Sequence, residues 1–175
     1  MTAANEFFYR ETAGAAEMEA LGFATKKLAP NGTRLFLSGQ LGAGKTVFCR
    51  GYLRAAGYSG RVKSPTFTIV ESYTMPNFVI HHFDLYRIDN PIELDFIGLE
   101  QYFDDQNDVL VEWPINGQGT LPLPDVTIEI VLGSGSELRE VKMNAENKRG
   151  LAVISGLREV SVSELSENFC GLEND

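Results

Sequence analysis

The sequence is poor in cysteine, with only Cys49 and Cys170 among its 175 residues. Two cysteines are too few for a disulfide framework and lack the paired spacing of a zinc site, so we expect reduced thiols. No apolar run reaches the roughly 18 residues that a membrane span needs. The amino-terminal stretch MTAANEFFYRETAGAAEMEA has neither a basic start nor a long apolar core, which argues against a secretory signal. These absences predict a cytoplasmic protein that does not contact a membrane.

The remaining composition is that of an ordinary globular chain, with 43% hydrophobic and 22% charged residues. Its length suits a single domain, 1–175, with a proper core. The net charge of −9 is unevenly spread: residues 1–87 carry 10 Lys/Arg and 6 Asp/Glu (+4), and residues 88–175 carry 5 and 18 (−13). The acidic half argues against broad nonspecific nucleic-acid binding, whereas the basic half can still bind an anion.

Strand and helix patterns alternate along the chain. Helical spacing of apolar residues predicts helices over 15–29, 44–57 and 92–103, and a short closing helix is expected over 161–169. Short apolar runs predict strands over 33–39, 78–86 and 108–113, with a further strand after a loop in 61–73. Period-2 alternation over 125–145 predicts a hairpin. Together these patterns predict an α/β fold with a P-loop NTPase-like sheet, mostly parallel with an antiparallel C-terminal hairpin, and helices on both faces.

The stretch Gly39–Thr46, GQLGAGKT, fits the phosphate-loop pattern G-x-x-x-x-G-K-[ST] without a mismatch. It follows a predicted strand and opens a predicted helix, a context that argues against a mere glycine-rich turn. Glycines allow the backbone amides to turn toward phosphate, and the dipole of the following helix adds positive potential at the same place. Lys45 is expected to pair with the β- and γ-phosphates, and the Thr46 hydroxyl to bind Mg²⁺. The predicted loop contacts are Gly39, Leu41, Gly42, Ala43, Gly44, Lys45 and Thr46.

Two acids stand where predicted strands end. Asp84 closes FVIHHFD and Glu112 closes DVLVE, so each is expected at the carboxyl edge of the sheet, where α/β proteins bind ligands. Such carboxylates order Mg²⁺ and its waters beside a phosphate loop, and Glu112 either binds the metal or orients the attacking water. Taken singly, each could be a solvated loop acid. Thr66, in SPTFT, is a further candidate for Mg²⁺ or the γ-phosphate, with a simple proline turn as the alternative.

The nucleotide is expected to be ATP. Guanine-specific switches use an N-K-x-D base reader, and the nearest string, NKRG at 147–150, lacks the aspartate. His81 and His82 are neighbours on a predicted strand and face opposite ways, so they cannot bind one metal together from that strand. At least one of them is expected to be a core or hydrogen-bonding residue. Trp113, directly after Glu112, either packs in the core or covers the nucleotide.

Four segments, LGAGKT, VKSPTFTIVESY, HFDLYR and LVEWP, occur in an order and spacing that closely resemble the TsaE (YjeE) family, over about Leu21 to Leu123. The resemblance implies a small P-loop ATPase required for threonylcarbamoyladenosine (t6A) in tRNA. It implies partnership with TsaB and with TsaD, which transfers the threonylcarbamoyl group, and only an indirect relation to tRNA. Hydrolysis of ATP would reset that complex between turnovers.

The resemblance also implies roles for individual residues. Gly42 to Thr46 would hold phosphate, Thr46 and Glu112 would hold Mg²⁺, and Asp84 would assist the metal or the water, so that the catalytic set is Lys45, Asp84 and Glu112. The family usually has aspartate where Gln40 stands, at a variable position of the pattern. Met18 takes the place of a first-helix threonine, so no base-binding residue is assigned.

Two other functions remain open from the residues alone: a small-molecule kinase and a nucleotide switch that does not hydrolyse. A kinase needs several arginines over the transferred phosphoryl group, and the site half offers Arg50, Arg54, Arg61, Lys63 and Arg87 but no lid-like insertion. Arg50 and Arg54 share one face of the helix over 44–57. They are either solvated or dock an acidic partner or tRNA, while Phe48 and Tyr52 face the core.

Overall fold

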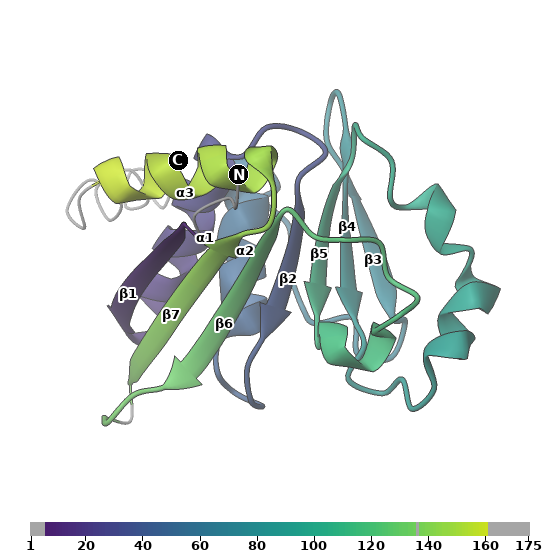
Figure 1. Ribbon diagram of the computed structural model, residues 1–175, viewed down its shortest axis with the longest axis horizontal. Coiled ribbons are helices and arrows are strands. Elements are labelled where there is room, and N and C mark those ends of the chain that lie inside the picture. Colours follow the sequence, from purple (N-terminus) through teal and green to yellow (C-terminus); the bar gives the residue numbers. More distant parts are fainter. Residues whose placement is uncertain (1–5, 136, 161–175) are drawn as a thin grey trace.

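The computed structural model describes residues 6–135 and 137–160, and within them seven strands form one sheet in the order β1-β7-β6-β2-β5-β4-β3 (Figure 1). The strands are β1 Phe7–Ala13, β2 Arg34–Ser38, β3 Val70–Thr74, β4 Val79–Asp84, β5 Asp108–Glu112, β6 Val126–Leu132 and β7 Leu138–Ala145. Strand β2 pairs in parallel with both β5 and β6, and β4 pairs in parallel with β5. The outer pairings, β1–β7, β6–β7 and β3–β4, are antiparallel. The predicted α/β sheet, parallel in its centre with an antiparallel C-terminal hairpin, is confirmed.

In the part of the chain that the structure describes, three α-helices share one apolar core with the sheet. They are α1 Gly14–Leu28, α2 Lys45–Ala55 and α3 Lys148–Glu159. Helices α1 and α2 lie side by side behind the sheet in Figure 1, and α3 crosses the upper end of β7 (Figure 1). Glycines let α1 and α2 approach closely, because a Cβ at Gly51 would lie 1.8 Å from the carbonyl oxygen of Glu19. The core includes Met18 from α1, Phe48 from α2 and Ile154 from α3.

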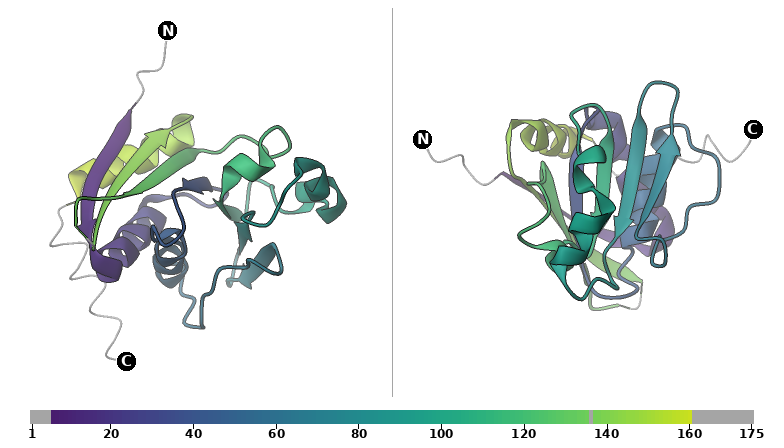
Figure 2. Two further views of the ribbon diagram at one scale, coloured as in Figure 1. Left: turned by 90° about the horizontal axis from the view of Figure 1, so that it is seen from below. Right: turned by 90° about the vertical axis from the view of Figure 1, so that its right-hand side faces the viewer.

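The other face of the parallel strands carries a second, smaller core. Phe36 of β2 and Val109 and Val111 of β5 point into it, while their strand neighbours point into the first core. Two 3₁₀ helices cover this face, η1 Pro91–Ile97 and η2 Leu99–Gln101. Figure 2 shows this segment on the side of the sheet away from α1 and α2. Because both faces of these strands are buried, they carry the near-continuous apolar runs seen in the sequence.

The helix expected over 92–103 is the main correction to the predicted elements. The chain forms η1 and η2 instead, separated by Gly98 in the left-handed conformation with φ of 69°. The expected apolar face also divides: Leu99 and Phe103 are buried, whereas Ile92 and Phe96 are 58% and 88% exposed. A left-handed glycine cannot continue a right-handed helix, so the apparent 3.6-residue spacing does not correspond to one helical face.

One strand and one α-helix of the structure were not expected from the sequence. Strand β1 extends the sheet beyond the hairpin by pairing with β7 along its whole length, and α3 follows that hairpin. Asn147 is the N-cap of α3, and its side chain accepts hydrogen bonds from the amides of Arg149 and Gly150. The helix expected over 161–169 and Cys170 lie outside the described residues, and Cys49 is a buried free thiol.

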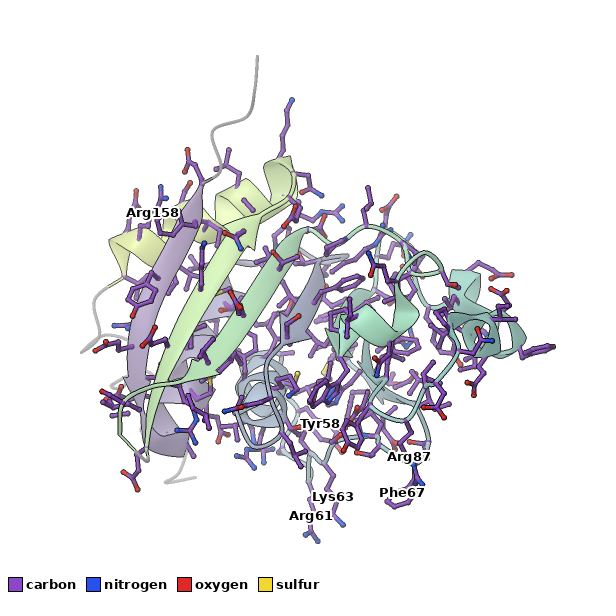
Figure 3. The ribbon with its side chains drawn as sticks, turned by 60° about the horizontal axis from the view of Figure 1, so that its bottom comes forward. Tyr58, Arg61, Lys63, Phe67, Arg87 and Arg158 are labelled. Carbon is purple, nitrogen blue, oxygen red and sulfur yellow. The ribbon has the colours of Figure 1, made fainter. Side chains whose placement is uncertain are left out.

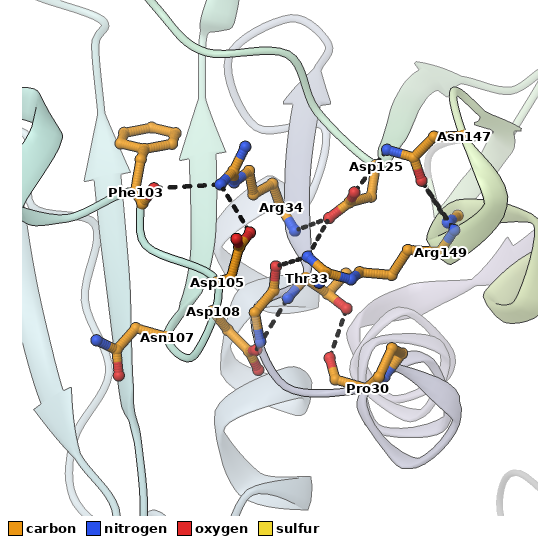
Figure 4. Close-up of polar contacts among 12 residues, drawn as sticks. Pro30, Thr33, Arg34, Phe103, Asp105, Asn107, Asp108, Asp125, Asn147 and Arg149 are labelled. Atoms are coloured by element: carbon orange, nitrogen blue, oxygen red, sulfur yellow. Dashed lines mark hydrogen bonds and ion pairs between the residues drawn. The ribbon is translucent and has the colours of Figure 1, made fainter.

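A polar network ties down the amino-terminal ends of the parallel strands (Figure 4). Asp125, just before β6, accepts hydrogen bonds from the Arg34 amide at 2.7 Å and from the Asn147 amide group at 2.7 Å. Arg149 lies 3.7 Å from the same carboxylate and donates to the Gly32 carbonyl at 2.6 Å. This end of the sheet is therefore fixed by charge-assisted bonds. None of the described helices is long and apolar enough to cross a membrane.

Candidate functional site

The opposite, carboxyl-terminal ends of β2, β4 and β5 bring together the segments that the sequence singled out. The loop Gly39–Thr46 leaves β2 and opens α2. Asp84 ends β4 and Glu112 ends β5, and the two are register partners on neighbouring parallel strands. Both acids are buried, with 4% and 2% of their surface exposed. The structure thus places both predicted acids beside the predicted phosphate loop.

The backbone conformation of the loop explains why glycine occupies two of its positions. Gly39 has φ of 150°, and a Cβ there would lie 2.4 Å from the carbonyl oxygen of Ile130. Gly44 is the N-cap of α2 in the left-handed conformation, with φ of 111°. A side chain at either position would clash or strain the backbone. The first turn of α2 therefore begins directly at the loop, and its unpaired amides and dipole favour an anion there.

Lys45 is held inside this loop. Its ammonium group donates to the carbonyls of Gly39 at 2.7 Å and Gln40 at 3.0 Å, and lies 3.9 Å from the centroid of the Trp113 ring. The residue is only 4% exposed. Burial lowers the pKa of Lys45, and the carboxylates of Glu112 and Asp84 oppose that shift. A cation is thus kept in the loop by neutral carbonyls, which an anionic ligand can replace as its partners.

Glu112 joins three elements through one oxygen. The Thr46 hydroxyl donates to Oε1 of Glu112 at 2.8 Å, and Nε2 of His82 is hydrogen-bonded to the same oxygen at 2.9 Å. His82 comes from β4 and is fully buried, so it fixes the carboxylate from behind. His81 faces the other way, 2.8 Å from the Ser72 hydroxyl, and burial lowers the pKa of its imidazole. The expectation that the two histidines face opposite sides of the strand is confirmed.

Asp84 fastens the loop between α2 and β3 to the sheet. Its Oδ2 accepts a hydrogen bond from the Thr66 hydroxyl at 2.9 Å and another from Ser64, and its Oδ1 accepts from the Tyr86 amide at 2.9 Å. The hydroxyls of Ser64 and Thr66 are also hydrogen-bonded to each other at 2.9 Å. Thr66 is therefore placed at the site, together with Ser64, which sequence reasoning missed although it begins the same SPTFT motif.

A cavity of about 300 Å³ lies among these groups. It is lined by Leu41, Gly42, Gly44, Lys45, Thr46, Val47, Ser64, Thr66, Asp84, Tyr86, Glu112 and Trp113. Two predicted loop residues do not line it: Ala43 is fully buried, and Gly39 contributes only its carbonyl to Lys45. Trp113 covers the Lys45 side of the cavity. Its φ of 60° places it in the left-handed region, costing about 1 kcal/mol, and its amide donates to Leu37.

A second cavity of about 360 Å³ lies on the other side of the same loop. It shares Gly42, Gly44 and Val47 with the first cavity, and its further lining residues are Gly14, Ala15, Met18, Ala43, Glu137 and Arg139. Arg139 of β7 donates from Nε to the Ala43 carbonyl at 3.2 Å. Sequence reasoning missed Arg139, because nothing local marks an arginine of a hairpin as a neighbour of a loop almost 100 residues away.

The structure gives both arginines of α2 partners within the chain. Arg50 forms an ion pair with Glu19 of α1 at 2.9 Å. Arg54 donates from one NH group to the carbonyls of Tyr58 and Gly60 at 2.8 and 2.9 Å. These arginines therefore join α2 to its neighbours, while Phe48 and Tyr52 are fully buried as expected.

Comparison with known proteins agrees with this arrangement. The family model described as "Threonylcarbamoyl adenosine biosynthesis protein TsaE" matches residues 12–141. The chain belongs to the TsaE family. Its family role lies in the biosynthesis of t6A in tRNA. The resemblance noted in the sequence is thereby confirmed.

Individual relatives extend the similarity over most of the chain. The chain is 42% identical over 121 residues to the TsaE protein of Haemophilus influenzae, covering 69% of this chain and 75% of that protein. It is 35% identical over 133 residues to the TsaE protein of Bacillus subtilis, covering 76% and 82%. The crystal structure of YdiB from Bacillus subtilis superposes with a TM-score of 0.73 at 28% identity, covering 96% of this chain and 99% of YdiB.

Proposed function

We propose that this TsaE-family protein binds ATP with Mg²⁺ in the cavity at the carboxyl ends of β2, β4 and β5, and hydrolyses it. One observation carries the proposal: Lys45, Thr46, Asp84 and Glu112 line a single cavity at the opening of α2. The hydrolysis serves TsaD and TsaB in the cytoplasm, resetting the threonylcarbamoyl transferase between turnovers. Contact with tRNA is then indirect, through that complex.

Phosphate binding follows from the loop. The amides at the start of α2 and the helix dipole attract the β- and γ-phosphates. Lys45 exchanges its carbonyl partners, Gly39 and Gln40, for phosphate oxygens, gaining charge-assisted bonds in place of neutral ones. The buried position of its ammonium group makes this exchange stronger than it would be in open solvent.

The residues present fit a magnesium ion. Mg²⁺ prefers oxygen ligands, and the cavity offers the Thr46 hydroxyl and the carboxylates of Asp84 and Glu112. Thr46 and Glu112 already share a hydrogen bond, so both are within reach of one ion. When bound, the ion neutralises charge that develops on the β- and γ-phosphates.

Hydrolysis breaks the bond between the γ-phosphorus and the bridging oxygen to ADP, and forms a bond from water to the same phosphorus. Glu112 is the group on this chain suited to orient that water, because His82 fixes its carboxylate from the buried side. Asp84 assists from the neighbouring strand end. Lys45 stabilises charge on the phosphoryl oxygens as the transition state forms.

The nucleoside end of ATP fits the second cavity. Gly42, Gly44 and Val47 line both cavities, so a nucleotide whose phosphates occupy the loop can extend its ribose and base toward Met18. Met18 is 1% exposed and offers a thioether in place of the hydroxyl usual in the family. It packs against the nucleoside by apolar contact.

The test is phosphate release from ATP and Mg²⁺ by the protein alone and with purified TsaB and TsaD. We expect slow phosphate release by the protein alone and faster release with both partners, without any added phosphoryl acceptor. Release only when a small-molecule acceptor is added, with phosphate transferred to it, would indicate a kinase. Stable ATP binding with no release, even with both partners, would indicate a switch.

A further inference from the structure

The segment between α2 and β3 presents a cationic and aromatic surface beside the candidate site. This Phe67 surface consists of Tyr58, Arg61, Lys63, Phe67 and Arg87. Figure 3 shows these side chains together at one side of the molecule, with Arg61, Lys63 and Phe67 projecting outward, and Arg158 at the far end. We propose that this surface docks an acidic patch of a protein partner of the ATPase, with Phe67 as its anchor. The inference rests on the proposed function, since the partner tested is the TsaB–TsaD complex.

Phe67 is the centre of the surface. It is 86% exposed, although burying an aromatic side chain is worth roughly 2 kcal/mol or more. The guanidinium of Arg87 lies 4.9 Å from the centroid of its ring, so the phenyl group meets a cation on one side. Aromatic residues and arginine dominate the binding energy of protein interfaces.

A hollow of about 310 Å³ adjoins Phe67, so the surface is concave there. Its wall is built on the rings of Tyr58 and Tyr73, packed edge to face with centroids 4.8 Å apart. Arg61 and Lys63 stand at its edge and are exposed, and Glu71 is the acid that lines it. The three cations Arg61, Lys63 and Arg87 outnumber that acid, in a chain of net charge −9. The complementary partner is therefore acidic.

The surface is connected to the nucleotide cavity through its own loop. Ser64 and Thr66 donate hydrogen bonds to Asp84. The exposed Lys63 directly precedes Ser64, and the exposed Phe67 directly follows Thr66. The Pro65 carbonyl accepts the Ile69 amide at 2.7 Å, and Ile69 takes the left-handed conformation with φ of 67°. Because Ser64, Thr66 and Asp84 also line the nucleotide cavity, ATP and Mg²⁺ bound there would compete for the hydroxyl contacts that hold this loop. A partner seated on Phe67 thereby senses the nucleotide.

The observations favour a protein over an RNA strand. Exposed apolar side chains continue the surface at the cavity mouth, where Leu41 is 74% and Tyr86 is 48% exposed. An interface with a phosphate backbone draws mainly on cations, whereas this one combines three cations with several apolar groups.

The experiment measures binding of the full-length chain to immobilised TsaB–TsaD complex, with ATP and Mg²⁺, at about 50 and about 300 mM salt. Phe67→Ala is expected to weaken binding by at least about tenfold at both salt concentrations. Arg61→Gln with Lys63→Gln is expected to slow association severalfold at low salt and less at high salt. The matched control, Lys148→Gln with Arg158→Gln on α3, removes the same charges from the far end and is expected to bind like wild type. ATP affinity of all the isolated variants should equal that of wild type, and so should the Tm of the variants at the Phe67 surface.

Each outcome decides between distinct claims. If wild type binds TsaB–TsaD and Phe67→Ala binds within about twofold of it, the docking surface is elsewhere and the proposed function stands. If wild type does not bind TsaB–TsaD at all, the proposed partnership fails, and this inference fails with it. A parallel titration uses an anticodon stem-loop RNA as the probe. Loss of RNA binding in the Phe67 and Arg61/Lys63 variants, with unchanged TsaB–TsaD binding, would overturn the inference in favour of RNA.

Discussion

The two ends of strand β5 each carry a buried acid, and the two acids differ in what surrounds them. Asp108, at the start, is fully buried and accepts from the Lys26 ammonium at 2.5 Å, the Tyr52 hydroxyl at 3.0 Å and the Gly32 amide at 2.8 Å. Glu112, at the end, is hydrogen-bonded to a hydroxyl and an imidazole and borders a cavity. Of the two acids, Asp108 is the one with a lysine ammonium group in direct contact.

The difference separates an acid that stabilises the fold from one that can serve a ligand. The donors around Asp108 leave its charge fully compensated and closed to solvent, and burial together with that charge raises the pKa of Tyr52 well above its usual range. Glu112 has no lysine or arginine in direct contact and interacts electrostatically with Lys45, which lines the same cavity. Under the proposed function, a bound magnesium ion would supply the further positive charge beside Glu112.

The largest expected effect is on the structural end. Asp108→Asn leaves the Lys26 ammonium buried without its carboxylate, and we expect the free energy of unfolding to fall by about 3 kcal/mol. The measurement is urea unfolding. Asp105→Asn is the control, because its side chain is 84% exposed in an ion pair of 3.4 Å with Arg34, and such pairs contribute less than about 1 kcal/mol. Equal losses of unfolding free energy in both variants would show that Asp108 stabilises the fold no more than an exposed acid does.

The next effect is on nucleotide binding at the other end. Lys45→Ala removes the cation inside the loop, and we expect ATP affinity in Mg²⁺ to fall by about 2 kcal/mol, or roughly thirtyfold. Calorimetric titration measures it, with exposed Lys63→Ala as the control of equal charge change. Wild-type affinity in Lys45→Ala would show that the loop is not the phosphate site.

A smaller effect should be visible in the emission of Trp113, the single tryptophan of the chain. Its ring faces the Lys45 ammonium at 3.9 Å, a contact of about 1 kcal/mol that is lost when Lys45 turns to phosphate. Emission should therefore change as ATP and Mg²⁺ are added, with the midpoint found by calorimetry. A flat emission titration alongside calorimetric binding would place the nucleotide away from the indole.

The smallest expected effect is that of Glu112→Gln on stability. Glutamine can still accept the Thr46 hydroxyl through its carbonyl oxygen, so the free energy of unfolding should change by less than about 1 kcal/mol. Urea unfolding alongside Asp108→Asn gives the comparison within one strand. A loss near that of Asp108→Asn would make Glu112 a structural acid as well.

Local pattern was enough to predict the centre of the fold and most of the candidate site. The spacing of glycine, lysine and threonine in the loop at 39–46 is typical of a phosphate loop and of few other structures. Asp84 and Glu112 each follow an apolar run, which predicts that they stand at strand ends. Parallel strands bring their carboxyl ends to one edge, so these residues meet without further information. Contacts that depend on register, such as His82 with Glu112 or Ser64 with Asp84, have no such local signal.

The errors have physical causes too. Apolar residues at helical spacing over 92–103 were divided by Gly98, whose left-handed backbone ends any helix there. Strand β1 was missed because it lies at the edge of the sheet, where exposed Phe7 and Tyr9 weaken the alternation between buried and exposed positions. Helix α3 was missed because Gly150, Ser155 and Gly156 weaken its helical pattern, and tertiary packing against α1 and β7 stabilises it.

The most direct measurement for the central claim is phosphate release from saturating ATP and Mg²⁺ by Glu112→Gln, with TsaB and TsaD present. We expect phosphate release to fall by more than roughly tenfold, equivalent to about 1.4 kcal/mol in the transition state, while ATP affinity and the free energy of unfolding stay near wild type. Release at the wild-type rate would contradict the account, because the acid at the end of β5 would then have no part in the chemistry.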